Sequence, residues 1–173
     1  TSIAVTTDDS NDEIVYASSM GDGVIQYKNG TPVQSYNEKN AFKETAGGYG
    51  SGYCYIDGLA FDKNGNLWMT SSEVNHAVLV LDKAGAWHRL DIEQLRGVYT
   101  INDILITSTN DKWIYVPRNT PKLVMIPNSE SLDEVSSYEF TTLIDTDGKE
   151  LTPSNYTCVA EDKDGYILSL IHI

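Results

Sequence analysis

The sequence is poor in the residues that build metal sites and disulfide frameworks. It contains only two cysteines, Cys54 and Cys158, and no C-x-x-C or H-x-x-x-H spacing. Neither a zinc-type site nor a dense disulfide framework is therefore expected. Each cysteine is instead expected to lie buried as a small apolar side chain. No run of apolar residues is long enough to span a bilayer as a helix.

Basic residues are also scarce. Lys and Arg number 12 against 25 Asp and Glu, which gives a formal net charge of −13, and the basic residues form no cluster. Nucleic acids and anionic lipids are bound through local Lys/Arg patches that release counterions. Neither is an expected partner, and this segment is not expected to insert into a membrane.

Histidine, the commonest general base, occurs three times. His88 flanks Trp87 in an expected strand, where a structural or surface role is favoured. His76 stands in an expected loop without ligand spacing to another residue. Ser51 lies in Gly-Ser-Gly, whereas a nucleophile elbow needs glycines two residues on either side of the serine. The sequence predicts no catalytic residue, no metal and no cofactor, and the chain is not expected to be an enzyme.

The residues that are abundant favour strands. Tyrosine dominates the aromatics, with 11 Tyr against 3 Phe and 3 Trp, and Thr, Val and Ile are frequent. No long segment has apolar residues at helical spacing. The composition predicts an all-β protein.

A repeated motif organises the chain. Residues 62–68 read DKNGNLW and residues 162–168 read DKDGYIL, each after an expected strand, and weaker copies begin near residues 9 and 108. An aspartate that caps the turn, followed by Asx-Gly, is typical of a tight hairpin. Taking Ile14, Leu67, Trp113 and Ile167 as equivalent gives intervals of 53, 46 and 54 residues. Such intervals are close to those of propeller blades.

The second copy of the motif along the chain, at residues 62–68, is called copy two. The sequence around it predicts four strands, near 54–61, 66–71, 77–81 and 86–91, and four strands make one blade. Residues 78–81 are apolar on both faces, as expected for a sheet between two neighbours, although a β-sandwich stays possible. The predicted fold is a β-propeller fragment of about three four-stranded antiparallel blades plus the first strand of a fourth. The predicted blades lie near 9–45, 54–92, 100–144 and 154–167.

The last residues depart from the repeat. An incomplete propeller domain is expected over residues 1–167, as part of a longer protein. Residues 168–173, LSLIHI, match the translation of a transposase mosaic-end adapter used in sequencing libraries. They are expected to be a non-native tail, and His172 therefore carries no functional prediction.

Candidate residues fall into two groups. Tyr49, Tyr53 and Tyr55 offer stacking surfaces for sugars or peptides beside a glycine-rich stretch, which can also be read simply as a flexible connection. The structural repeat residues are expected to serve turns and blade packing: Asp62, Gly65, Leu67, Trp68, Gly85, Trp87, Asp162 and Gly165.

The 62–68 motif resembles the two-component regulator propeller repeat. A closer resemblance is to the N-terminal propeller of the PorZ-like family of the type IX secretion system. It rests mainly on the segments 58–62, 66–70, 80–83 and 85–88. The third copy lacks the glycine and the fourth lacks the tryptophan, and the shared motif residues are structural, so no binding residue carries over.

The resemblance implies a non-catalytic docking module of a secretion accessory protein in the periplasm or on the surface of a Gram-negative bacterium. Its partner would be the sortase, another secretion component, or a surface glycan. Two alternatives stay open: the glycan-sensing periplasmic propeller of a hybrid two-component sensor, and a propeller lyase or lactonase.

Overall fold

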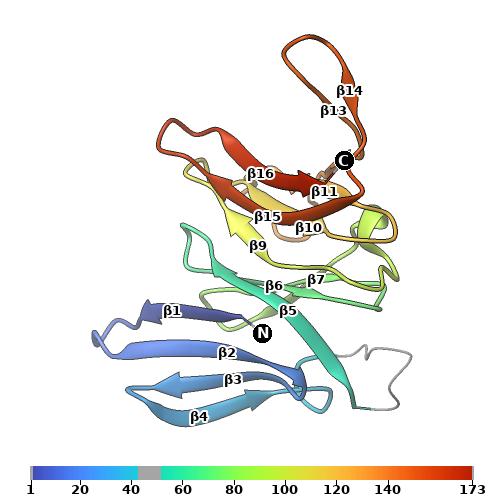
Figure 1. Ribbon diagram of the computed structural model, residues 1–173. Helices are drawn as coiled ribbons and strands as arrows, with labels where there is room; N and C mark the ends of the chain where they lie inside the picture. The colour runs from blue at the N-terminus through green and yellow to red at the C-terminus, as the bar shows by residue number, and fades with distance from the viewer. Residues whose placement is uncertain (1, 43–51, 173) are drawn as a thin grey trace.

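The computed structural model describes residues 2–42 and 52–172, and these residues are almost entirely β-structure (Figure 1). No helix among them is long and apolar enough to cross a membrane. Three four-stranded antiparallel sheets follow one another along the chain, and a two-stranded sheet and a small hairpin complete the fold. We call the three four-stranded sheets blades 1 to 3 and the two-stranded sheet at the C-terminal end blade 4.

Each blade uses consecutive strands in order. Blade 1 contains β1 (Ile3–Thr7), β2 (Glu13–Gly21), β3 (Gly23–Lys28) and β4 (Thr31–Tyr36). Blade 2 contains β5 (Cys54–Phe61), β6 (Leu67–Ser71), β7 (Val78–Leu81) and β8 (Trp87–Leu90). Blade 3 contains β9 (Ile104–Ile106), β10 (Lys112–Val116), β11 (Lys122–Ile126) and β12 (Tyr138–Phe140).

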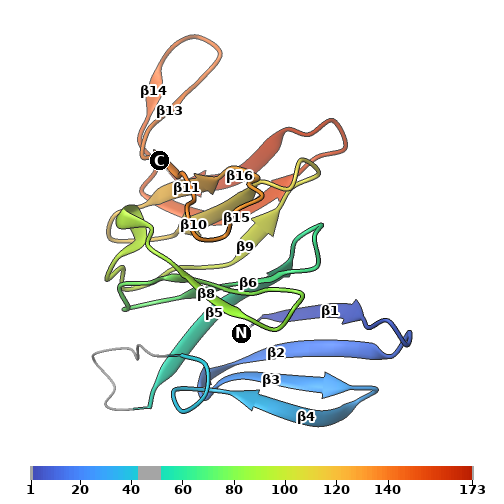
Figure 2. The same ribbon diagram turned by 180° about the vertical axis from the view of Figure 1, so that it is seen from behind.

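The remaining elements link or extend the blades. Figure 2 shows the single-turn 3₁₀ helix η1 (Glu93–Leu95) between blades 2 and 3 and the projecting hairpin of β13 (Leu143–Ile144) and β14 (Glu150–Leu151). Blade 4 consists of β15 (Asn155–Glu161) and β16 (Ile167–His172). The end of β2 pairs with the start of β5, which joins blades 1 and 2 into one eight-stranded sheet.

One hairpin turn recurs throughout the fold. In the turn after β5, Oδ1 of Asp62 accepts hydrogen bonds from the backbone N–H groups of Asn64 and Asn66, and Gly65 takes a positive φ of 84°. Glycine enters this left-handed region without the Cβ penalty. Equivalent turns start at Asp8, Asp82, Thr107, Asp145 and Asp162.

The positions of these turns show that two copies of the repeated motif were aligned one residue out of register in the sequence analysis. The turns start at residues 8, 62, 107 and 162, so the residues equivalent to Leu67 and Ile167 are Glu13 and Lys112. The predicted equivalents, Ile14 and Trp113, are one position late. The weak copies hid this because Asn11 and Asn110, at φ 62° and 68°, replace the glycine.

The hydrophobic core lies in the seams between blades. Leu67 and Met69 of β6 pack towards blade 1, whereas Trp68 packs towards blade 3. Every residue of β6 and β7 is buried, so both faces of blade 2 are covered. A third cluster joins blades 3 and 4 through Tyr115 and Tyr156. This stacking is the arrangement of propeller blades and confirms the predicted fold class.

The strands expected in copy two are confirmed within one residue at each end. Blade 1 also includes β1, ahead of the expected boundary at residue 9, and blade 4 has two strands where one was expected. Residues 168–172 lie in β16, paired with β15. Both cysteines were expected to be buried. The structure confirms this for Cys54, but the prediction is wrong for Cys158, which is exposed because β15 packs on blade 3 through other residues. Both thiols are free.

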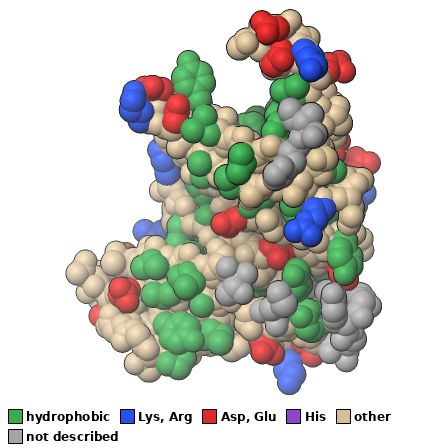
Figure 3. All heavy atoms as spheres, viewed as in Figure 1, with side chains coloured by type: hydrophobic (Ala, Val, Ile, Leu, Met, Phe, Trp, Pro, Cys, Tyr) green, Lys and Arg blue, Asp and Glu red, His purple; other side chains and the backbone are tan. Residues whose placement is uncertain are grey.

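One face of blade 1 is apolar and accessible. Ile3 and Val5 on β1 and Val33 on β4 are 64%, 58% and 52% exposed. Ile3 and Val5 stand opposite Ala17 and Val15 on β2. Figure 3 shows hydrophobic side chains gathered over this blade.

Candidate functional site

The connections between strands gather at two ends of the blades. We call the end that carries the turns 8–12, 62–66, 82–86, 107–111 and 162–166 the turn face. We call the opposite end, with residues 72–77, 91–103, 117–121 and the connection from blade 3 to blade 4, the loop face. The antiparallel order of the strands produces this division. Loops on a rigid scaffold are where binding residues concentrate.

Two of the three tyrosines predicted to bind a ligand meet on the loop face. The rings of Tyr53 and Tyr55 stack with centroids 6.2 Å apart and an interplanar angle of 17°. Tyr99 is 60% exposed, and partial burial together with the nearby Asp57, Tyr53, Tyr99 and Glu73 raises the pKa of Tyr55. Tyr49 lies outside the described residues. The described pair forms an aromatic platform that can stack on a sugar or a peptide side chain.

A carboxyl group with an unusual pKa lies near this platform. Burial raises the pKa of Asp57 to about 7, a hydrogen bond from Ser72 opposes the shift, and Asp103 adds to it. Ser72 Oγ donates to Asp57 Oδ2 at 2.6 Å and accepts a hydrogen bond from the backbone N–H of Ile101 at 2.8 Å. Because this network joins β5 to the connection before β9, Asp57 serves the seam between blades 2 and 3.

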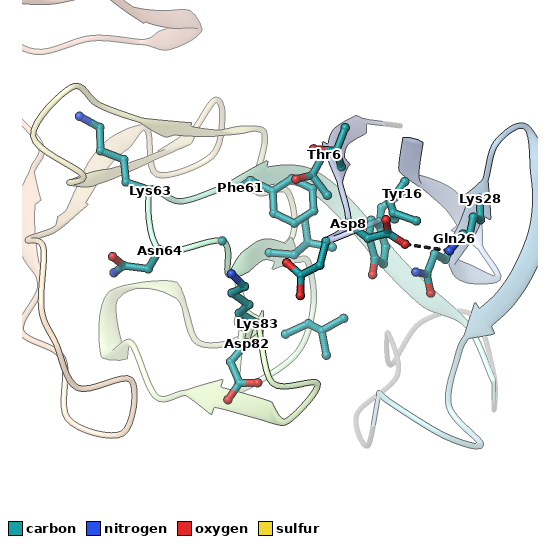
Figure 4. A pocket seen from close by; sticks show the side chains of 16 residues that line it. Thr6, Asp8, Tyr16, Gln26, Lys28, Phe61, Lys63, Asn64, Asp82 and Lys83 are labelled. Atoms are coloured by element: carbon teal, nitrogen blue, oxygen red, sulfur yellow. Dashed lines mark hydrogen bonds and ion pairs between the residues drawn. The ribbon is translucent and has the colours of Figure 1, made fainter. Parts of the chain in front are cut away.

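The turn face carries a groove of about 550 Å³ between blades 1 and 2 (Figure 4). Its apolar lining includes Ile14, Tyr16, Phe61, Leu67 and Leu81. The ring of Tyr16 meets that of Phe61 edge-on at 5.8 Å and 70°. Burial, with Tyr36 as the next cause, raises the pKa of Tyr16 to about 12. The Tyr16 hydroxyl therefore stays protonated at physiological pH.

The rim of the groove carries both signs of charge. Lys28 Nζ lies 2.8 Å from carboxylate oxygens of both Asp8 and Asp12, and these hydrogen bonds raise the pKa of Lys28. Figure 4 shows Lys28 on the blade 1 side and Lys83 and Asp82 on the blade 2 side. An apolar floor with a mixed-charge rim suits an amphipathic segment of another protein better than a strongly charged polymer.

The described residues contain no group of three or more His, Cys, Asp or Glu placed to hold a metal ion. His88 bridges two carboxylates, with Nε2 3.1 Å from Asp82 Oδ2 and Nδ1 3.1 Å from Asp133 Oδ1. This contact joins blade 2 to the connection after β11.

The sequence matches no family model and no curated protein. Among solved structures, PorZ, described as an essential bacterial surface component of the type IX secretion system of Porphyromonas gingivalis, superposes with a TM-score of 0.83 at 18% identity. This chain has the fold of that PorZ region. The match covers 96% of this chain and 23% of the PorZ chain, so this chain spans about a quarter of the PorZ length.

The extracellular domain of a hybrid two-component system of B. thetaiotaomicron also matches. Its TM-score is 0.35 at 15% identity, over 96% of this chain and 31% of that domain's chain.

The residues expected to be structural have the following places in the blades. Asp62 and Asp162 cap turns, Gly65, Gly85 and Gly165 take positive φ within turns, Leu67 and Trp68 fill opposite seams, and Trp87 packs edge-on against Tyr36 and Phe42. Sequence reasoning missed the groove. The available signal was the repeated Asp-Lys pair at 62–63 and 82–83, which places Lys63 and Lys83 in turns on the turn face.

Proposed function

We propose that this chain is the non-catalytic propeller segment of a type IX secretion accessory protein in the periplasm or at the surface of a Gram-negative bacterium. Its task is to dock a secretion partner, such as the sortase, or a surface glycan. The observation that carries the proposal is the superposition on PorZ, with a TM-score of 0.83 over 96% of the chain.

Two features of the molecule support a binding role. Its buried residues form seams between blades, which makes the arc a scaffold for the loops. The Tyr53–Tyr55 platform lies on the loop face and the amphipathic groove on the turn face, so two separate surfaces are available for partners. Tyrosine rings provide large contact areas at low conformational cost.

The Tyr53–Tyr55 platform is the surface we assign to the ligand. The two rings stack on each other within 17° of parallel, and both side chains are half-buried, so part of each ring is accessible to a ligand. A pyranose ring or a partner's aromatic side chain would stack on it, and the Tyr55 hydroxyl would add a hydrogen bond. Replacement of both tyrosines by alanine removes this surface.

The test uses the natural gene in its own bacterium. Tyr53→Ala with Tyr55→Ala should reduce surface attachment of secreted cargo severalfold, measured by fractionation and immunoblotting of cargo proteins. Tyr138→Ala is the matched control, because Tyr138 is an exposed tyrosine on β12, 54% accessible, away from the platform. The control should leave secretion unchanged.

Two results would count against the proposal. Normal cargo attachment in a strain lacking residues 1–167 would refute a secretion role. A transmembrane helix and a histidine kinase encoded in the same reading frame would assign the segment to a two-component sensor instead. A sorting domain encoded in that frame would support the secretion role.

A further inference from the structure

Two of the three seams between blades are closed at the turn face by hydrogen bonds. Between blades 2 and 3, the backbone N–H of Lys63 donates to Asn110 Oδ1 at 2.9 Å, and Lys63 Nζ donates to the carbonyl of Ser108. Between blades 3 and 4, the backbone N–H and the hydroxyl of Ser108 each donate to the Glu161 carboxylate at 2.6 Å. In both seams, the second residue of one turn is therefore bonded to the next blade.

The seam between blades 1 and 2 lacks this contact. The second residue of the turn 8–12 is Asp9, and within the described residues no hydrogen bond joins this turn to the turn 62–66. The groove of about 550 Å³ lies at this position and is lined by residues of both turns. The open seam is a departure from the contact that joins the other blades, and it leaves room for a segment from outside.

The floor of this groove is apolar. Ile14, Tyr16, Leu67 and Leu81 are each 9% exposed or less, and Phe61 is half-buried beside Tyr16 (Figure 4). The rings of Phe61 and Tyr16 meet edge-on, so they form one continuous surface across the two blades. An apolar side chain that covers this surface gains from the removal of both from water.

The two walls of the groove carry vacant charges of opposite sign. Asp9 on the blade 1 wall and Lys83 on the blade 2 wall both line the groove, and both are exposed. Within the part of the chain that the structure describes, neither charge is paired, whereas Lys28 is held by Asp8 and Asp12. One carboxylate and one ammonium group are therefore available to a ligand, from opposite sides of the groove.

An extended peptide matches this arrangement. Successive side chains of an extended chain point to opposite sides, so adjacent basic and acidic residues reach opposite walls. A polyanion would meet Asp9 and a chain of net charge −13, and a neutral ligand would leave both vacant charges without a partner. The groove therefore favours a segment in which two adjacent charges of opposite sign stand between apolar residues.

We propose that the groove between blades 1 and 2 binds an extended segment of a partner protein, in which a basic and an acidic residue stand next to each other between two apolar residues. The basic side chain pairs with Asp9 and the acidic side chain with Lys83, while the apolar residues contact the floor. The site goes beyond the proposed function, because it lies on the turn face, away from the Tyr53–Tyr55 platform, and requires no glycan.

The test is an NMR titration of the isotopically labelled full chain with three end-capped hexapeptides. They are Gly-Ile-Lys-Asp-Leu-Gly, Gly-Ile-Asp-Asp-Leu-Gly and Gly-Ile-Lys-Lys-Leu-Gly, which differ only in the central pair. The mixed-charge peptide should shift the resonances of Tyr16, Phe61 and Leu81. It should bind about fivefold more tightly than either like-charged peptide, because only its central pair matches both walls. Equal binding of the three peptides, or shifts confined to other surfaces, would overturn the proposal.

Charge reversal at one wall should change the preferred peptide. Lys83→Glu should weaken the mixed-charge peptide about fivefold and make the Lys-Lys peptide the tightest binder, and Asp9→Lys should likewise favour the Asp-Asp peptide. Lys149→Glu is the matched control, because Lys149 is exposed in the β13–β14 hairpin and lies outside the groove. It should leave the preference for the mixed-charge peptide unchanged. If Lys83→Glu keeps the wild-type order of preference, the assignment of the acidic residue to this wall is wrong.

Two further measurements separate other outcomes. If sedimentation shows a dimer that Lys83→Glu dissociates, the groove serves a second copy of this chain, and the peptide assignment is overturned. Tyr53→Ala with Tyr55→Ala should leave peptide binding unchanged. Loss of cargo attachment in that double variant and loss of peptide binding in the groove variants are therefore independent results, and either proposal can fail while the other stands.

Discussion

Lys112 on β10 holds its ammonium group over the indole ring of Trp68 on β6, 4.6 Å from the ring centre. The same Nζ lies 4.0 Å from Asp62 Oδ2, and Trp68 Nε1 donates to that oxygen at 2.9 Å. The Lys112 and Asp62 side chains are 2% and 1% exposed. A desolvated cation from blade 3 is thus held by an anion and a ring from blade 2. We infer that this contact fixes the register of the two blades.

Replacing Lys112 by methionine should destabilise the fold by about 1–3 kcal/mol, because Asp62 keeps its charge but loses its cation. The loss is limited because Asp62 still accepts hydrogen bonds from Asn64, Asn66 and Trp68. Chemical denaturation measures the free energy of unfolding. Lys163→Met, which removes an exposed ion pair with Asp164, should cost below about 0.5 kcal/mol. Equal effects of the two variants would contradict a special role for Lys112.

The Lys112 contact is an example of a feature that could not be predicted from the sequence. The Asp-x-x-Gly turns could be predicted because their hydrogen bonds are local, within four residues of the aspartate. Lys112 could not be placed, because a lysine at a strand start is normally solvated. Its partner Asp62 lies in another blade, and Asn110 in place of glycine shifted the predicted register by one.

The candidate surfaces were predictable to different degrees. Tyr53 and Tyr55 stand out in sequence because they flank a glycine-rich stretch and lie on alternate residues of one extended segment. The groove of Figure 4 combines segments from blades 1 and 2, and only the packing of the two blades brings those segments together.

Asp57 predicts a pH dependence of stability. Burial raises the pKa of Asp57 to about 7, so the folded state favours the protonated carboxyl. This stabilising contribution is fully present below the unfolded pKa of about 4 and is lost as pH rises through about 7. Asp57→Asn should therefore exceed the wild type in stability at pH 8, by up to about 4 kcal/mol, and differ little at pH 4. Thermal unfolding across this range checks it.

The control for this experiment is Asp147→Asn, at the exposed tip of the β13–β14 hairpin. It should reproduce the wild-type pH profile. If Asp57→Asn loses stability equally at both pH values, the group acts through its charge or shape and not through its raised pKa.

His88 should titrate above its ordinary range. The hydrogen bond to Asp82 chiefly raises the pKa of His88, burial opposes this, and Asp133 adds to the increase. A raised histidine pKa stabilises the fold fully below about pH 6.5, and this contribution is lost as pH rises through the folded pKa. We expect the His88 ring protons to titrate above pH 6.5 by NMR. Asp133→Asn should move that midpoint down, and an unchanged midpoint would show that Asp133 does not contribute.

Gly58 should tolerate no side chain, because its position is set by a neighbouring backbone. A Cβ there would stand 2.8 Å from the backbone nitrogen of Ile104 and 2.9 Å from Cα of Asp103. Neither atom can rotate away, so Gly58→Ala must push β5 from β9. The expected loss is about 2–3 kcal/mol of unfolding free energy, with faster amide exchange in both strands.

The matched change is Gly85→Ala, in the turn between β7 and β8. A Cβ there would meet nothing within 4 Å, but Gly85 has a φ of 89°. Its cost of about 1–2 kcal/mol is backbone strain confined to one turn. The two variants should therefore differ most in which part of the structure they loosen. Gly58→Ala should loosen the seam between blades 2 and 3, while Gly85→Ala should leave amide exchange in β9 unchanged. Identical exchange patterns would mean that close backbone approach does not hold these blades together.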